Sequence, residues 1–201
     1  NGADCFKVLA MLEERLGSNF VPVQLPIGSG EAFNGLVDLV EMKAITYEEA
    51  SQGVKFFEDD IPDDLMPITL EYRERLLEAA AEFDDELLEK FLEGEEISPD
   101  EIRAALRQAT IALKAVPVVC GSAYKYKGVQ RLLDNVICYL PAPADVEDVK
   151  GVLPNSDEQV VRSARDDAPF SGLAFKVMTD PFVGRLTFVR IYSGVMEAGS
   201  Y

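Results

Sequence analysis

The spacing of apolar and acidic positions predicts a long amphipathic helical region in the middle of the chain. Between Leu65 and Leu87, apolar residues recur every three or four positions, and acidic residues recur with the same spacing on the opposite side. The apolar positions are Leu65, Ile68, Tyr72, Leu76, Ala79, Phe83 and Leu87, and the acidic positions are Glu71, Glu74, Glu78, Glu82, Asp85 and Glu89. We expect the carboxylates to face solvent, on one helix or on two helices separated at Asp84 and Asp85.

Capping residues mark three further helices. Asp4 is the expected N-cap of a helix that ends at Gly17. Residues 98–101 (SPDE) have the sequence of a capping box with proline at the first helical position, so another helix begins there. The last helix is predicted over residues 128–140 and ends at Pro141.

The extended segments fall into two groups. Residues 20–27 have strand composition but contain Pro22 and Pro26, so we expect an edge strand or a loss of pairing at the prolines. Three β-rich runs punctuated by glycines follow, at residues 33–40, 42–47 and 54–58. Together they predict a small antiparallel sheet. The apolar run 116–120 instead predicts a buried strand of an α/β sheet, in which ligands gather at the carboxyl ends of strands.

The remainder of the chain lacks helical periodicity. Residues 142–169 are rich in Pro, Asp, Glu and Ser, and we interpret them as a linker between domains. Two strands are expected at residues 170–179 and 186–192, joined by a loop that exposes Phe182 and Val183. Because two strands form a marginal sheet, we interpret them as the start of a larger domain.

Composition limits the chemistry that this chain can perform. It has 201 residues, of which 48% are hydrophobic, and no apolar stretch approaches the roughly 20 residues of a membrane span, so we expect a cytoplasmic protein. Histidine is absent from the sequence, which removes the commonest general base and the commonest metal ligand. The three cysteines, Cys5, Cys120 and Cys138, lie among apolar neighbours and are expected to be buried free thiols.

Negative charge is concentrated in one segment. The formal net charge is −17, and residues 58–101 hold 18 acidic and three basic residues, a net −15. Such a field opposes autonomous binding to nucleic acid, which requires lysine and arginine contacts, and it favours a basic partner. An ordinary solvated surface is the alternative. A calcium site at Glu93, Glu95, Glu96 and Asp100 is a further alternative, although the spacing of an EF-hand loop is absent.

Several short stretches are characteristic of one protein family. They are VPVQLPIG at residues 21–28, ALRQ at 105–108, CGSA at 120–123, KGVQ at 127–130, YLP at 139–141 and FSGLAFK at 170–176. The most specific block is DPFVG at residues 180–184, followed by LTF at 186–188 and YSG at 192–194. Over its whole length the chain resembles an internal part of elongation factor G, the ribosomal translocase family.

The resemblance implies an α/β fold with an α+β insertion, taken from the C-terminal end of a translational GTPase domain. Residues 1–19 would be a helix of that domain, 20–113 the G′ subdomain with its antiparallel sheet and acidic helices, and 114–141 the last strand and helix of the GTPase domain. Residues 142–169 would be the linker. Residues 170–201 would be the first strands of a second-domain β-barrel that the chain holds only in part.

The resemblance also identifies a nucleotide-binding loop. Gly121, Ser122 and Ala123 match the motif whose backbone N–H groups face the guanine carbonyl oxygen. An ordinary strand-to-helix turn is the alternative, and Ser122 as a nucleophile lacks a base that could activate it. The glycines at residues 28–30 do not fit a dinucleotide motif. No phosphate-binding G-x-x-x-x-G-K-[ST] sequence is present, so we expect no bound cofactor, no metal ligands and no catalytic residues in this chain.

By the same resemblance, the longer protein would bind GTP or GDP with magnesium and would couple GTP hydrolysis to movement of transfer RNA and messenger RNA through the ribosome. Its partners would be ribosomal RNA and the basic domain of the ribosomal stalk protein. Glu71, Glu74 and Glu78 are the expected contacts for the stalk domain. The alternative function is a non-catalytic acidic module that docks such a basic domain.

Overall fold

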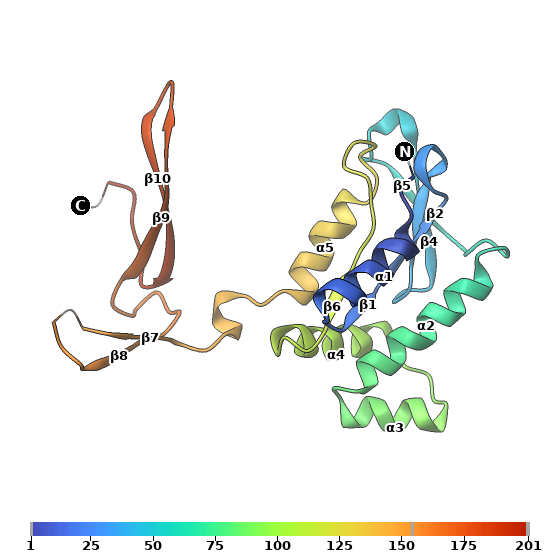
Figure 1. Ribbon diagram of the computed structural model, residues 1–201, viewed down its shortest axis with the longest axis horizontal. Helices are drawn as coiled ribbons and strands as arrows, with labels where there is room; N and C mark the ends of the chain where they lie inside the picture. Colours follow the sequence, from blue (N-terminus) through green and yellow to red (C-terminus); the bar gives the residue numbers. More distant parts are fainter. Residues whose placement is uncertain (1, 154, 200–201) are drawn as a thin grey trace. The chain divides into compact units, whose positions relative to one another are not determined.

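The chain forms a mixed α/β structure with small sheets, and the computed structural model describes residues 2–153 and 155–199. It divides into two compact units, Asn1–Leu140 and Pro141–Tyr201 (Figure 1). Within the described residues, no helix is both long enough and apolar enough to cross a bilayer. The three cysteines are free, as expected, but each is half-buried rather than buried.

The first helix, α1 (Cys5–Leu16), has the predicted ends. The Asp4 carboxylate accepts a hydrogen bond from the Lys7 N–H at 3.1 Å, which pairs one of the N–H groups that a helix start leaves open. Gly17 closes the helix in the left-handed conformation, with φ of 62°. Both capping predictions are confirmed.

The predicted strand at residues 20–27 is split between two sheets. β1 (Phe20–Pro22) pairs in parallel with β6 (Val116–Val118), whereas β2 (Gln24–Ile27) is the edge strand of an antiparallel sheet. The other strands of that sheet are β3 (Gly35–Asp38), β4 (Lys43–Tyr47) and β5 (Phe56–Asp59), in the order β2-β3-β4-β5. The small antiparallel sheet is therefore confirmed, and Pro26 lies in an edge strand as the missing N–H requires.

Short 3₁₀ turns lie in the two connections that flank this sheet's central strands. η1 (Gly30–Ala32) follows β2, and η2 (Glu49–Ser51) follows β4. Residues 28–34 therefore connect β2 to β3, and residues 48–53 lie between β4 and β5. Both connections belong to the same unit as α1 and β6.

The acidic segment forms two helices, α2 (Met66–Ala81) and α3 (Asp85–Glu93), so the two-helix alternative is confirmed. The Asp84 carboxylate caps α3 by accepting the Glu86 and Leu87 N–H groups, each at 3.1 Å. Leu76 and Leu87 of the predicted apolar stripe are buried, and its other members are half-buried against the same core, so the stripe is confirmed. Thr69 and Ala80 are buried beside it, where α2 packs against α3, α4 and β1.

The helix predicted from the capping box is α4 (Pro99–Ile111), and the box is confirmed. The Ser98 N–H donates to Glu101 Oε2 at 2.9 Å, and the Glu101 N–H donates back to Ser98 Oγ at 3.4 Å. α4 supplies much of the core of this unit, in which most of the buried side chains come from α4, α2 and the segment from β1 to just after β3. They include Val21, Val23, Val37, Leu39, Leu76, Ile102, Ala105, Leu106 and Ala109.

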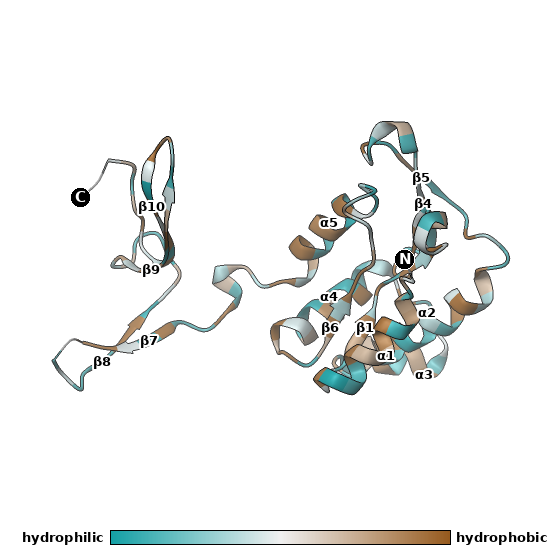
Figure 2. Cartoon of the chain, turned by 45° about the horizontal axis from the view of Figure 1, so that its top comes forward, coloured by the Kyte–Doolittle hydropathy of each residue, from teal (hydrophilic) through white to brown (hydrophobic). Residues whose placement is uncertain are grey.

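β6 is followed by a loop and by α5 (Val129–Tyr139), close to the predicted bounds. The prediction of a buried strand through residue 120 is wrong, since β6 ends at Val118 and Val116 is 42% exposed. The described part of the chain gives β6 one paired neighbour, β1, so no second strand shields it. Arg107 of α4 donates to the carbonyls of Cys138 and Leu140 at 2.8 and 2.9 Å, which fixes the end of α5. Apolar residues remain exposed along α5 (Figure 2).

The second unit contains two hairpins. Residues 142–169 are not a structureless linker, because they contain η3 (Pro143–Asp145) and a hairpin of β7 (Val149–Val152) and β8 (Gln159–Arg162). The polar and proline-rich composition of the segment concealed these four-residue strands, which are too short to give a clear alternation. The sequence prediction of a linker is therefore wrong for residues 149–162.

The second hairpin confirms the predicted strands as β9 (Ser171–Asp180) and β10 (Gly184–Ser193). The Asp180 carboxylate accepts the N–H groups of Phe182 and Val183 at 2.8 and 2.9 Å, which shapes the turn. Phe182 is 95% exposed, as expected from the sequence.

We predict that the Glu101 carboxylate makes the stability of the first unit depend on pH. Hydrogen bonds from Lys90 and then from Ser98 lower the pKa of Glu101 from 4.5 to about 2. Because the folded-state pKa is depressed, this stabilisation is present above pH 4.5 and is lost as the pH falls toward 2. The free energy of unfolding is measured with urea at several pH values for the wild type and for Glu101→Gln. Between pH 4.5 and 2 it should fall less steeply with decreasing pH in the variant than in the wild type.

The matched control is Glu96→Gln, since Glu96 is an exposed carboxylate with no hydrogen bond among the described residues. Its acid slope should equal that of the wild type. Equal slopes for Glu101→Gln and the wild type would show that the capping box carries no charge-dependent stability.

Candidate functional site

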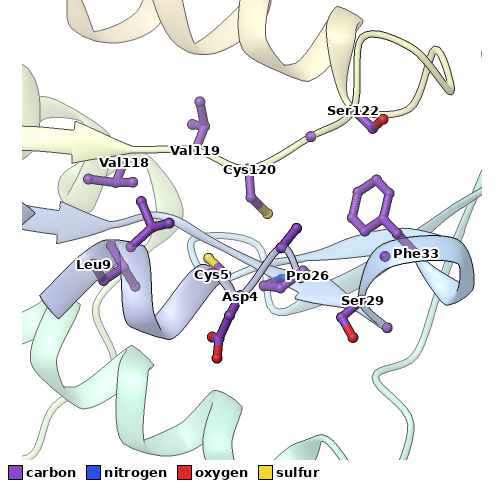
Figure 3. A pocket seen from close by; sticks show the side chains of 15 residues that line it. Asp4, Cys5, Leu9, Pro26, Ser29, Phe33, Val118, Val119, Cys120 and Ser122 are labelled. Carbon is purple, nitrogen blue, oxygen red and sulfur yellow. The ribbon is translucent and has the colours of Figure 1, made fainter. Parts of the chain in front are cut away.

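A pocket of about 410 Å³ lies among three segments of the first unit (Figure 3). One wall is the start of α1, the second is the loop between β2 and β3, and the third is the chain that leaves β6. Its lining residues are Ala3, Asp4, Cys5, Val8, Leu9, Pro26, Gly28, Ser29, Gly30, Phe33, Val118, Val119, Cys120, Gly121 and Ser122. The pocket therefore lies at the carboxyl end of β6, the position at which the sequence predicts a ligand site.

The β2–β3 wall depends on a tight turn at Gly28. Its φ of 76° is in the left-handed region, and a Cβ at this position would lie 2.2 Å from the Ala32 carbonyl oxygen. A residue with a side chain cannot occupy this position without displacing the backbone. Gly28 is thus required for the wall to fold back beside the pocket.

The loop that follows β6 is a closed turn built from its own backbone. The Ser122 N–H donates to the Lys127 carbonyl at 2.8 Å, and the Lys127 N–H donates to the Ser122 carbonyl at 3.1 Å. The Tyr126 N–H donates to the Ala123 carbonyl at 3.1 Å, with Tyr126 itself at φ of 56°. Ser122 and Lys127 thus form the base of the loop, and the hydrogen bonds between them define its conformation.

The three predicted nucleotide-loop residues are placed differently. Gly121 and Ser122 line the pocket, whereas Ala123 is exposed and does not line it. The Ser122 N–H is already paired with Lys127, while the Ala123 N–H makes no hydrogen bond within the described chain. Of the Ser-Ala pair, Ala123 is therefore the residue whose N–H is available to a ligand.

Two cysteines lie on opposite walls of the pocket, Cys5 on α1 and Cys120 after β6 (Figure 3). Burial, with a smaller contribution from Cys5, raises the pKa of Cys120 to about 12. Burial and the nearby Asp4 carboxylate also raise the pKa of Cys5. Both thiols stay protonated at neutral pH, so they act as apolar wall rather than as nucleophiles.

The structure gives no support to the other chemistries considered. Ser122 Oγ accepts the Lys125 N–H at 3.3 Å, and no carboxylate or other base bonds to it among the described residues. The described residues contain no group of three or more potential metal ligands. Asp100, one of the residues considered for calcium, pairs with Arg103 at 3.1 Å.

Two functional candidates were missed by the sequence analysis, Lys125 and Lys127. Both extend from the loop after β6 to the β2–β3 loop, and Lys127 is only 4% exposed. The signal that could have revealed them is two lysines within three residues in a chain of strongly negative charge. Periodicity did not reveal them because loops have none.

The acidic face on α2 is exposed as predicted, with Glu71, Glu74 and Glu78 all at the surface. Glu71 pairs with Arg75 at 2.6 Å, and that guanidinium lies over the Tyr72 ring at 5.0 Å from its centre. Beside Glu78 is a hollow of about 550 Å³ between α2 and α3. Its lining residues are Asn19, Arg75, Glu78, Ala79, Ala81, Glu82, Leu88, Phe91 and Leu92. The surface therefore combines carboxylates with apolar side chains.

Comparison with known proteins shows a structural match to part of a longer protein. No protein-family model matches the chain. A solved crystal structure of a protein from Thermus thermophilus is similar over 96% of this chain, with a TM-score of 0.72 and 29% sequence identity. The chain spans 26% of the length of that protein. The mixed α/β fold is thus shared with a segment of the Thermus protein.

We predict that the chain alone does not bind GTP or GDP at micromolar concentration. The pocket offers apolar walls and a short loop, but the sequence has no glycine-rich loop that could hold the phosphates. Isothermal titration calorimetry with each nucleotide and magnesium should therefore give no binding heat. A micromolar dissociation constant, a binding free energy of about −8 kcal/mol, would contradict this prediction and would show that the chain holds the phosphates by itself.

Proposed function

We propose that this chain is an internal segment of a translational GTPase of the elongation factor G type. The longer protein would use GTP with magnesium to move transfer RNA and messenger RNA through the ribosome in the cytoplasm. The observation that carries the proposal is the pocket at the end of β6, lined by Gly121 and Ser122 of the CGSA motif. The structural match supports a translation-factor-like fold, and the choice of elongation factor G rests on the sequence motifs.

The pocket has the properties that a purine base requires. Its volume of about 410 Å³ is in the range of small-molecule sites, and Pro26, Phe33 and Val119 give it apolar surfaces on which a flat ring can lie. The neighbouring Ala123 N–H is a donor for a carbonyl oxygen at the edge of the base. In this proposal, the chain supplies the base site, and the phosphates and magnesium are held by other residues of the longer protein.

The second candidate function is protein docking, and a specific surface favours it. Glu71, Glu74 and Glu78 are exposed on α2 within the segment that carries −15 of the net charge. Such a field accelerates association with a basic partner. We propose that this face docks the basic domain of the ribosomal stalk protein, and that the docking and base-binding roles belong to the same longer protein.

The proposed function is tested by assaying the longer protein for GTP hydrolysis with and without ribosomes. We expect strong stimulation by ribosomes. Ala123→Val should weaken GDP binding by about tenfold, because a larger side chain beside the donor N–H hinders a close approach of the base. Ala104→Val, at an exposed position of α4, is the matched control and should bind GDP normally. Hydrolysis that ribosomes do not stimulate would rule out the proposal.

We predict that reversing the acidic face weakens docking with little effect on folding. The triple variant Glu71→Lys, Glu74→Lys and Glu78→Lys changes exposed groups, and exposed ion pairs each contribute only about 0.2–1 kcal/mol to stability. Its affinity for the stalk domain should fall sharply, and the remaining binding should depend less on salt concentration. Surface plasmon resonance over a range of salt concentrations, with thermal melting of the variant, measures both.

The control for the triple variant of the α2 face changes the net charge by the same amount, but in the second unit. Glu147→Lys, Asp157→Lys and Glu158→Lys replace three exposed acids of the second unit. This control should keep most of its affinity. If the two triple variants bind equally well, the α2 face is an ordinary solvated surface.

A further inference from the structure

Two lysines connect opposite walls of the pocket. Lys125 Nζ donates to the carbonyls of Gly30 and Glu31 at 3.1 and 2.7 Å. Lys127 Nζ donates to the Phe33 carbonyl at 3.2 Å and to Asn34 Oδ1 at 3.4 Å. Both ammonium groups thus extend from the loop after β6 to the loop between β2 and β3.

Each lysine also holds the wall from which it comes. The Lys125 N–H donates to Ser122 Oγ, and the Lys127 backbone exchanges two hydrogen bonds with Ser122. Ser122 lines one side of the pocket, and Gly30 and Phe33 line the other. The separation between Ser122 and the β2–β3 loop is therefore fixed through these two side chains.

Burial of the Lys127 ammonium group carries a desolvation penalty. Lys127 is 4% exposed, and its carboxylate partner Glu49, 3.6 Å away, lies at the surface with 86% of its side chain exposed. A buried ammonium is destabilising unless hydrogen bonds and a counter-charge compensate it, so the contacts with Phe33, Asn34 and Glu49 must be kept together. This requirement makes the connection rigid.

The start of α5 and the residue Tyr126 of the loop also contact the connection between β4 and β5. Gln130 Nε2 donates to the Gly53 carbonyl at 2.6 Å. A Cβ on Gly53 would lie 1.9 Å from the Tyr126 carbonyl oxygen, so the two backbones are in close contact. The second half of the loop after β6 and the start of α5 are consequently held by connections of the four-stranded sheet.

We propose that Lys125 and Lys127 are positioning residues for the base: they set the separation of the pocket walls and thereby the affinity of the site for guanine. The four-stranded insertion then contributes to nucleotide affinity through these lysines. This inference rests on the base site assigned under the proposed function. It predicts that removing either ammonium loosens the pocket without unfolding the unit.

The first test measures the separation of the walls without any nucleotide. The rate at which N-ethylmaleimide alkylates Cys120 is measured by mass spectrometry in the wild type, Lys125→Met and Lys127→Met. We expect the Cys120 rate to rise at least about tenfold in each variant, because each loses the two hydrogen bonds of a charged group. Cys138, which is outside the pocket, should react at an unchanged rate. Lys55→Met, which removes an exposed lysine of the same unit, is the control.

The second test measures base binding directly, with guanosine at millimolar concentration and adenosine as the control ligand. Amide NMR shifts of Gly121 and Ala123 report binding. Lys125→Met and Lys127→Met should weaken guanosine binding about tenfold at an unchanged melting temperature, and Lys125→Arg should restore most of it. A purely structural role would instead lower the melting temperature and leave the guanosine affinity of the folded protein unchanged.

The outcomes separate this inference from the proposed function. Absence of guanosine shifts in the wild type would overturn the base site, while the Cys120 rates would still decide whether the lysines hold the walls. Unchanged Cys120 rates in folded variants would overturn the inference itself. Lys125 is only half-buried, so Lys125→Met keeps the test decisive even if Lys127→Met fails to fold.

Discussion

In the first unit, the backbone hydrogen bonds of Val23 connect the two sheets at the point where the chain passes from one to the other. Its N–H donates to the Val118 carbonyl at 2.9 Å, and its carbonyl accepts the Leu39 N–H at 3.0 Å. The side chain is 1% exposed and belongs to the main core. Pro22 ends β1 opposite Val118, and Val23 follows it with one backbone hydrogen bond to each side, so Val23 joins the two sheets.

The position of the pocket follows from this crossing. After Val23, β2 leads away from β6 into the antiparallel sheet, and the β2–β3 loop and the chain after β6 become the facing walls of the pocket. Two strands that separate leave space between them, and here that space is bridged by lysine ammonium groups rather than by packed side chains. An apolar bridge would need more residues to fill the gap, whereas an ammonium can bond to several carbonyl oxygens at once.

The acidic helices are attached to the same framework. Arg73 of α2 donates to the Leu39 and Val40 carbonyls at the end of β3, and burial lowers its pKa although Asp38 and Glu41 oppose that shift. Arg73 therefore anchors α2 from its inner side, which leaves Glu71, Glu74 and Glu78 on the outer side. Acidic residues can gather there because the helix is held by its buried residues and by Arg73 and does not depend on its surface charges.

The sequence by itself determined the local features of this protein. The N-caps Asp4 and Ser98 and the turn at Asp180 were predictable because each satisfies backbone groups within a few residues along the chain. The strand–loop–helix order around β6 also followed from the sequence, and the pocket at the carboxyl end of β6 lies where the CGSA motif led us to propose a ligand site.

Only the tertiary structure decided the long-range features. These include the division of residues 20–27 between two sheets, the short β7–β8 hairpin and the burial of Lys127. Each depends on partners far along the chain: Val23 bonds to Val118, and Lys127 bonds to Phe33. A periodic pattern records which face of an element is apolar, but it does not record which distant backbone group will receive a given hydrogen bond.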